Sequence, residues 1–221
     1  MSHFIGICFT FGGEGILDMN LEPYDEQTED KEYLEFVDCT EEVEGEFKSL
    51  PEVDEKIYDN GQRRDKDLAH YPTIEEFAED WFGYKKQDGR WGYVTNPKAK
   101  WDWYAIGNRW DGYLYGKNGE EYNRLPFDEV DWEKMFKKVE ETYTNFEGKE
   151  ETYTETHIPF CFVDTDGEWH ERAEMGWFAC TSNEKDVDVW EKEVKDYVKS
   201  IQDLPEEERE DIMVWAVDFH I

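Results

Sequence analysis

The residues best suited to bind a ligand lie between positions 81 and 117. This stretch holds seven Lys or Arg, three Asp or Glu, eleven aromatic residues and six glycines. The sequence around it is acidic, and the whole chain of 221 residues has a formal net charge of -33. Cationic groups, flat rings and flexible backbone together suit a small anionic, aromatic molecule such as a nucleotide. We therefore expect a cationic aromatic pocket here.

The densest part of this stretch runs from position 96 to 112 and reads NPKAKWDWYAIGNRWDG. In an extended strand, Trp101 and Trp103 would share one face and Tyr104 would lie on the other. A base would then stack on an indole, and its phosphate would pair with Arg109 or a lysine. The alternative is a core strand in which Arg109 forms a structural pair with Asp102 or Asp111. The ligand-binding residues predicted from this block are Lys98, Lys100, Trp101, Trp103, Tyr104, Arg109 and Trp110.

The two ends of the sequence supply further candidates. The segments His3 to Phe11 and Ile212 to Phe219 are apolar on both alternating faces, which is typical of central strands covered on both sides. If they pair antiparallel, His3 comes close to Asp218 and His220, which completes the predicted ligand-binding set. These three side chains also suit a metal or acid and base catalysis. Because two residues at i, i+2 form a weak pattern, we predict no metal and no cofactor, and assign no catalytic residue.

Strands and helices alternate irregularly, which favours an α+β fold with a mainly antiparallel sheet, central N- and C-terminal strands and two or three amphipathic helices. Residues 1–221 are expected to form a single domain. Helices are predicted at 131–146 and 184–204, and Thr73 with Glu76 forms a capping-box pattern. Residues 18–60 are predicted to form an acidic surface excursion, a long loop with one short helix at 31–36. The glycines at positions 12, 13 and 15, which precede it, are not expected to lead into a helix.

Two turn patterns predict hairpins, and one further run predicts a short strand. Asn118-Gly119 suits a type I′ turn, and Asp164 to Gly167 separates two strand-like runs at 157–163 and 168–174. A further short strand is predicted at 176–180.

Composition excludes several classes of protein. An aromatic content of 17% argues against general disorder, and the four cysteines lack CxxC spacing, which favours reduced thiols over zinc or disulfide bonding. No signal peptide or apolar run long enough to span a bilayer is present. A pI near 4.3 implies repulsion from polyanions, so neither direct nucleic-acid binding nor membrane binding is expected. We predict a soluble cytoplasmic protein, and its oligomeric state stays open.

The sequence resembles a group of uncharacterised proteins from bacteriophages and mobile elements. Its members begin MSHF, contain an NPxxKWDWYxxGGRWxG block and end in D-x-H-I, and this chain matches at both ends and in the middle. It departs from the pattern at Asn108, where the group has Gly. The resemblance implies a phage protein acting in the host cell cytoplasm, and it implies no particular activity.

Three functions follow from these observations. The first is an anti-defence protein that binds and sequesters a small anionic nucleotide, an immune second messenger of the bacterial host, in the cationic aromatic pocket. The second is an acidic mimic of nucleic acid that inhibits a host defence protein. The third is a nucleotide hydrolase that uses His3, Asp218 and His220. Because the chain lacks the GxSxG, Walker, HExxH and GxGxxG motifs, sequestration is preferred to catalysis.

Overall fold

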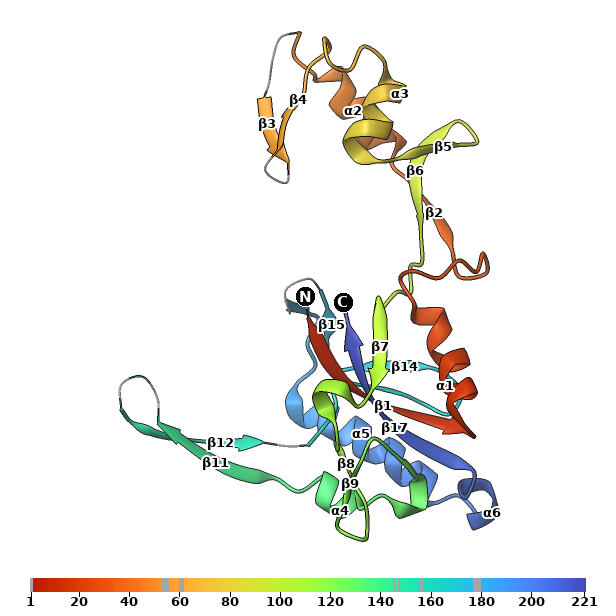
Figure 1. Cartoon of the computed structure of the whole chain (residues 1–221), viewed down its shortest axis with the longest axis vertical. Coiled ribbons are helices and arrows are strands. Elements are labelled where there is room, and N and C mark those ends of the chain that lie inside the picture. Colours follow the sequence, from red (N-terminus) through yellow and green to blue (C-terminus); the bar gives the residue numbers. More distant parts are fainter. Residues whose placement is uncertain are drawn as a thin grey trace. The chain divides into compact units, whose positions relative to one another are not determined.

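Two nine-residue strands, β1 (His3–Phe11) and β17 (Ile212–His220), form the centre of the main sheet in the computed structural model (Figure 1). They pair antiparallel over their whole length, from His3 opposite His220 to Phe11 opposite Ile212. Most of their side chains are buried, because the sheet is covered on both faces. The prediction of an α+β fold with these two strands at the centre is confirmed.

The structure describes residues 2–52, 56–59, 62–144, 146, 148–155, 157–176 and 180–221. Contacts divide the chain into two compact units: unit 1 contains residues 1–27 and 98–221, and unit 2 contains residues 28–97. The chain, which the sequence predicts to be a single domain, therefore contains two compact units, and we describe each one separately.

The main sheet belongs to unit 1 and has the strand order β10-β17-β1-β13-β14. β7 also pairs with β17, beside its second half, while β10 pairs with its first half. The sheet is mixed, because β1 pairs in parallel with β13 and the other pairs are antiparallel. The bounds of these strands are Trp103–Ile106 for β7, Arg124–Pro126 for β10, Cys161–Val163 for β13 and Trp169–Glu171 for β14.

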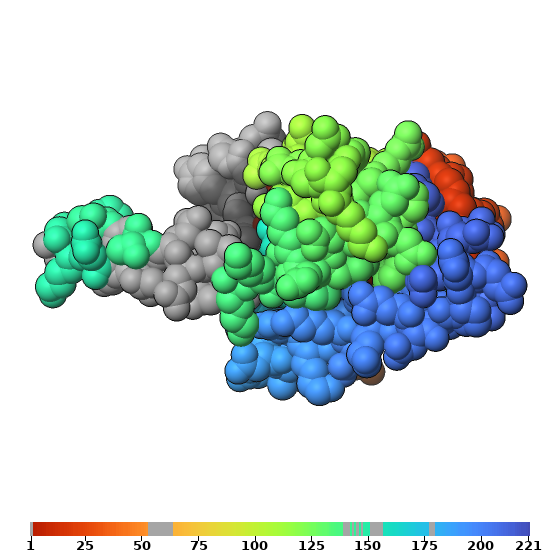
Figure 2. All heavy atoms as spheres, turned by 90° about the horizontal axis from the view of Figure 1, so that it is seen from below, coloured from red at the N-terminus to blue at the C-terminus, as the bar shows by residue number. Residues whose placement is uncertain are grey.

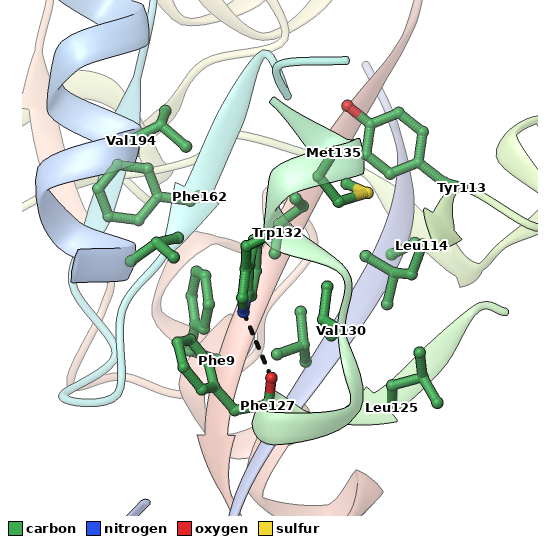
Figure 3. Close-up of a cluster of buried hydrophobic side chains, with 14 of the residues drawn as sticks. Phe9, Tyr113, Leu114, Leu125, Phe127, Val130, Trp132, Met135, Phe162 and Val194 are labelled. Carbon is green, nitrogen blue, oxygen red and sulfur yellow. Dashed lines mark hydrogen bonds between the residues drawn. The ribbon is translucent and has the colours of Figure 1, made fainter. Parts of the chain in front are cut away.

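One face of this sheet packs against the amphipathic helix α5 (Val187–Gln202) and the segment from residue 113 to 135. Figure 2 shows α5 and this segment side by side on the same side of the molecule. In the core beneath them the Phe9 and Trp132 rings stack 6.1 Å apart, and the Trp132 indole donates a hydrogen bond to the Phe127 carbonyl (Figure 3). The opposite face packs against helix α1 (Glu14–Leu21), through Leu17 and Leu21.

Unit 2 has its own small core. A three-stranded antiparallel sheet, ordered β2-β6-β5, packs against helices α2 (Thr40–Lys48) and α3 (Ile74–Phe77). Val43 and Phe77 are fully buried in this core, together with most of Trp91. The bounds of the three strands are Glu35–Asp38 for β2, Lys85–Gln87 for β5 and Arg90–Thr95 for β6.

The predicted helix at 131–146 is wrong beyond its first turn. Helix α4 covers Trp132–Met135, with the Asp131 side chain accepting a hydrogen bond from the Lys134 amide, and strand β11 (Val139–Thr144) follows. The run VEETYT is rich in β-branched and aromatic residues, which lowers its helix preference. It pairs with β12 (Glu150–Glu155), a strand that the sequence reasoning missed.

Residues 12–48 contain more regular structure than expected. The glycines lead directly into α1, with Gly13 at its N-cap, so the prediction of no helix there is wrong. The short helix at 31–36 is also wrong: residues 35–38 form β2, because Phe36 pairs opposite Val94 of β6. Inside the predicted excursion Leu21 and Val43 are fully buried. Leu21 therefore belongs to the hydrophobic core of unit 1 and Val43 to that of unit 2.

Of the other local predictions, the capping box, the helix at 184–204 and the turn at 164–167 are confirmed. The Thr73 hydroxyl accepts from the Glu76 amide and the Glu76 carboxylate accepts from the Thr73 amide, and the helical segment ends at Gly83 with φ 74°. The helix predicted at 184–204 is α5. The turn at 164–167 joins β13 to β14. The hairpin predicted around 118–119 is formed by β8 (Leu114–Tyr115) and β9 (Glu121–Tyr122), but its turn is not type I′, because Gly119 has a positive φ and Asn118 does not. The predicted strand at 176–180 includes residues 177–179, outside the described residues.

The remaining elements are short. The strands are β3 (Lys56–Asp59), β4 (Gln62–Asp65), β8 (Leu114–Tyr115), β9 (Glu121–Tyr122), β15 (Glu174–Met175) and β16 (Thr181–Ser182). The short helices are η1 (Glu22–Tyr24), η2 (Ala78–Phe82), η3 (Asn108–Trp110), η4 (Phe127–Glu129) and α6 (Glu206–Arg209). Across the part of the chain that the structure describes, none of the helices has both the length and the apolar character needed to cross a membrane.

Candidate functional site

Strand pairing gathers the sequence-predicted residues from the two chain ends. His3 lies opposite His220, and Asp218 lies opposite Ile5. Cross-strand partners share a face, and side chains two residues apart on one strand do so as well. His3, Asp218 and His220 therefore lie on the face of the sheet that carries Ile5 and packs toward α5.

Each of the two histidines is paired with a carboxylate. The Nδ1 atom of His3 lies 2.9 Å from Oδ1 of Asp218, and Nδ1 of His220 lies 2.6 Å from Oδ1 of Asp102. A carboxylate only accepts, so Nδ1 donates in both pairs, and Nε2 of a neutral ring keeps its lone pair. Within the described residues, neither Nε2 atom has a hydrogen-bond partner. We call these four residues, with Trp103 and Asn108, the histidine cluster.

Asp218 is the most deeply buried member of the cluster, with no exposed surface. Its second oxygen, Oδ2, accepts a hydrogen bond of 2.7 Å from Asn108 Nδ2 and a longer one of 3.5 Å from the Arg109 amide. Together with His3, these donors satisfy a carboxylate that would otherwise be costly to bury. Asp218 therefore holds His3 and the 107–110 loop in place.

The aromatic rings of the cluster pack closely together. The His3 and His220 ring centroids are 4.8 Å apart at an interplanar angle of 72°, and Trp103 stacks on His220 at 4.9 Å and 16°. Trp103 is 39% exposed, whereas the side chains of His3 and His220 are 9% and 6% exposed. The cluster thus meets solvent mainly through Trp103 and through Asp102, which is 26% exposed.

The loop that carries Asn108 depends on two positive φ angles. Gly107 has φ 73° and Asn108 has φ 54°, a region that Gly and Asn tolerate better than other residues. A Cβ on Gly107 would lie only 2.4 Å from the Asn123 side chain, so this position requires glycine. Asn108 adopts this left-handed conformation, and its side chain donates a hydrogen bond to Asp218.

The structure separates Trp101 from Trp103, contrary to the extended-strand interpretation. β7 begins at Trp103, after a bend at Asp102, and Trp101 packs in the opposite core, 5.2 Å from the Tyr104 ring. Tyr104 donates a hydrogen bond to Asp18 of α1. Burial raises the pKa of the Tyr104 phenol, and the Asp18 carboxylate raises it further. Both Trp101 and Tyr104 therefore lie on the other face of the sheet from the histidine cluster.

The basic residues of the block have different surroundings. Lys100 pairs with Glu171 at 2.6 Å, and Lys98 is exposed. Arg109 is exposed and forms no ion pair within the described residues, while Trp110 packs at the edge of the α5-side core. The alternative pair of Arg109 with Asp102 or Asp111 is not formed: Asp102 bonds His220, and Asp111 accepts from Asn123. Of the ligand-binding residues predicted from the block, Trp103 and the Arg109 backbone amide therefore reach the cluster.

The cationic aromatic stretch is divided between the two units. Residues 81–97 belong to unit 2, where they form the end of the α3 segment and the β5–β6 hairpin. Residues 98–117 belong to unit 1. We therefore describe the two halves separately, each within its own unit.

A cavity of about 170 Å³ lies on the same face of β1 as His3. Ile5, two residues along the strand from His3, lines it together with Ile158, Trp190 and Arg172. The Nε atom of Arg172 is buried without a hydrogen-bond partner, and its guanidinium also pairs with Glu184. The cavity thus offers apolar walls, one guanidinium and one carboxylate, that of Glu191.

Sequence reasoning did not include Asp102 and Asn108 in the site. The NPKAKWDWYAIGN run contains both, and the signal that could have found them is their position on either side of β7, which pairs with the strand carrying Asp218 and His220. Within the described residues, no group of three or more His, Cys, Asp or Glu side chains is arranged to hold a metal ion. The cluster is instead an arrangement of two separate histidine–aspartate pairs.

The fold and the cluster define an α+β protein with two oriented imidazoles at the end of its central strands. Comparison of the chain with protein-family models, with curated proteins and with solved structures finds no match.

Proposed function

We propose that the chain binds a small anionic nucleotide at the histidine cluster and hydrolyses one of its phosphoester bonds. The observation that carries this proposal is the pair of adjacent imidazoles, each oriented by an aspartate through Nδ1. Two histidines with free Nε2 atoms supply a base and an acid within one site, and general acid–base catalysis contributes about 10²- to 10⁴-fold to a rate.

The proposed reaction uses both Nε2 atoms. One imidazole removes a proton from water as the water oxygen forms a new bond to phosphorus. The other imidazole, protonated at Nε2, gives its proton to the ester oxygen as the bond between that oxygen and phosphorus breaks. The products are the phosphate and the released hydroxyl, and proton exchange with solvent restores both rings. Asp102 and Asp218 hold the rings in the required tautomer and stabilise each imidazolium.

Binding of the rest of the nucleotide is assigned to the surroundings of the cluster. The partly exposed Trp103 indole suits stacking of a base, and the exposed Arg109 suits a phosphate oxygen. The cavity beside Ile5 would accept an apolar extension, because the charges of Arg172 and Glu191 in its lining are opposite. The resemblance to phage and mobile-element proteins makes nucleotide second messengers of bacterial defence the first substrates to test.

Sequestration without cleavage is the second candidate. It is favoured by the burial of both imidazoles, which leaves Trp103 as the most exposed ring of the cluster. In this case the nucleotide would stack on Trp103 and pair with Arg109 without a water molecule reaching both Nε2 atoms. The same anti-defence role would then follow from tight binding alone.

The test is incubation of the purified protein with a panel of cyclic and linear nucleotides, followed by mass analysis of the bound and free fractions. Hydrolysis predicts an altered nucleotide, and sequestration predicts an intact nucleotide released by heat. If neither fraction changes and nothing is bound, nucleotide chemistry at this site is wrong, and the acidic-mimic hypothesis becomes the one to pursue.

Matched variants test the role of the cluster. His3→Asn and His220→Asn each keep a donor near the Nδ1 position but remove Nε2, so we expect the hydrolysis rate to fall about 100-fold or more. His170→Gln is the control, because His170 also pairs with a carboxylate, Asp164 at 3.1 Å, but lies outside the cluster. Equal rates in all three variants and in the wild type would contradict catalysis by the cluster.

A further inference from the structure

The β5–β6 hairpin of unit 2 presents basic and apolar side chains on one face of its sheet. Its turn is Asp88-Gly89, with φ 50° and 81°, as a type I′ turn requires. Lys85 lies opposite Gly92, and Gln87 lies opposite Arg90. These four residues share a face, whereas the adjacent pair, Lys86 and Trp91, lies on the face that packs into the unit 2 core.

A groove of about 500 Å³ follows this hairpin and the neighbouring strand β2. Phe36, Lys85, Gln87 and Val94 line it. A Cβ on Gly92 would lie 2.8 Å from Cζ of Phe36, so the Phe36 ring lies against the glycine backbone. Val94 is 54% exposed, which leaves an apolar surface open beside the ring. We call this surface the Lys85 groove.

Among the described residues, Lys85 is the groove-lining cation that forms no ion pair. Arg90 lies 5.4 Å from the Phe36 ring centroid and 3.7 Å from Asp38, and Lys86 pairs with Glu75 at 3.1 Å. Lys85 is exposed and forms no ion pair with any other described residue. In a chain with a formal charge of -33, a lysine that is unpaired among the described residues and lies beside a half-buried aromatic ring and a second cation marks a local attraction for anions.

We infer that the Lys85 groove is a binding site for a nucleoside phosphate, separate from the histidine cluster. The phosphate would pair with Lys85, assisted by the Gln87 amide, and the base would lie against Phe36 and Val94. Stacking on an aromatic ring tolerates any base, and a lysine ammonium contributes as a point charge. The site contains no histidine from the cluster, so it would hold the nucleotide without cleaving it.

The experiment is a titration of ¹⁵N-labelled protein carrying His220→Asn with AMP and, separately, with inorganic phosphate. AMP is expected to shift the amide signals of Gly83 and Gly92, which line the groove. Lys85→Gln in the same background should weaken the affinity for AMP about tenfold, because a charge-assisted contact is lost. Lys48→Gln is the control: it removes the same charge from α2 at a side chain that is 73% exposed, and should change the affinity less than twofold.

A second variant tests the ring contact. Phe36→Leu keeps an apolar side chain beside Gly92 but removes the stacking surface, and should weaken AMP binding about fivefold or more. AMP that leaves the Gly83 and Gly92 signals unchanged, or a Lys85→Gln protein that binds AMP as the Lys48→Gln control does, would overturn the inference. Inorganic phosphate that binds as tightly as AMP would overturn the assignment of a nucleoside.

Discussion

The residues of the histidine cluster lie far apart in the sequence, whereas those of the Lys85 groove lie mainly within one hairpin and one strand. The cluster joins residues that are 215, 118 and 110 positions apart in the sequence, and Asp218 at its centre is fully buried. The groove comes mainly from one hairpin and one neighbouring strand, and Lys85 and Val94 are exposed. The cluster is therefore part of what stabilises unit 1, whereas the groove side chains can change with little effect on the fold.

The largest expected effect is removal of residues 218–221. This deletion removes the buried Phe219 together with Asp218 and His220, and with them the pairing of this end of β17 with β1 and β7. We expect a loss of more than about 5 kcal/mol of unfolding free energy, enough to unfold unit 1. Circular dichroism melting measures this loss. An unchanged melting temperature would contradict the statement that the cluster stabilises unit 1.

Two glycine substitutions should each destabilise one of the two units. A Cβ on Gly6 of β1 would lie 2.5 Å from the Phe219 ring, and a Cβ on Gly92 of β6 would lie 1.9 Å from the Val37 carbonyl oxygen. We expect Gly6→Ala and Gly92→Ala each to cost about 3 kcal/mol, the first in unit 1 and the second in unit 2. Hydrogen exchange of the backbone amides locates the loss.

Gly15→Ala is the control for both substitutions. Gly15 lies in α1, and a Cβ there would meet no atom within 4 Å. Alanine should stabilise this helix by up to about 1 kcal/mol. A loss of protection spread evenly over both units in the Gly6 and Gly92 variants would contradict the division into units.

Buried tyrosines should make both units sensitive to alkaline pH. Burial raises the pKa of Tyr197 in unit 1 to about 12. The pKa of Tyr71 in unit 2 is also raised to about 12, first by burial and then by its hydrogen bond to Asp80. In the unfolded chain a tyrosine loses its proton near pH 10, so the folded protein binds more protons between pH 10 and 12. Stability is therefore fully present below pH 10 and falls as the pH rises through this window.

Tyr197→Phe tests this pH dependence in unit 1. The Tyr197 hydroxyl accepts a hydrogen bond of 2.8 Å from the Thr165 amide, so the variant should lose about 1 kcal/mol at pH 7. The difference from the wild type should shrink between pH 10 and 12, since phenylalanine cannot ionise. Urea unfolding at several pH values measures both quantities. A difference that stays constant up to pH 12 would contradict the raised pKa.

The smallest expected effect on stability is that of Lys85→Gln. The side chain is exposed and unpaired within the described residues, so the unfolding free energy should change by less than about 0.5 kcal/mol. The deletion of residues 218–221 and this variant are thus expected to cause the largest and the smallest loss of unfolding free energy. A large loss of stability would show that the Lys85 groove, like the cluster, is part of the structural framework.

Much of the fold could be predicted because some sequence patterns permit only one structure. β1 and β17 are apolar on both faces, and the Thr73 capping box fixes a helix start, so both were predicted at or near their observed bounds. The run from 131 to 144 permits two structures, because Trp132, Met135 and Val139 fit a helical stripe while VEETYT also fits a strand. Pairing with residues 150–155 decides for the strand, and that partner cannot be read from local periodicity.

The candidate site could also be predicted in part. The expected pairing of the two apolar strands brought His3 close to Asp218 and His220, as the structure has it. The contributions of Asp102 and Asn108 depend on where β7 begins and on the register of its pairing with β17, which sequence does not specify. For the same reason the sequence placed Trp101 on the face of Trp103.

The pairing of β1 with β17 also sets an order of events during protein synthesis. All the residues of unit 2 have left the ribosome once residue 97 emerges, whereas β1 has no β17 to pair with until residue 220 is made. During that interval a nine-residue strand with two apolar faces is without its main partner on the growing chain, a state prone to aggregation. Emergence of β17 from the ribosome is therefore the step at which unit 1 can close. Chaperone binding to the nascent chain should persist until that moment.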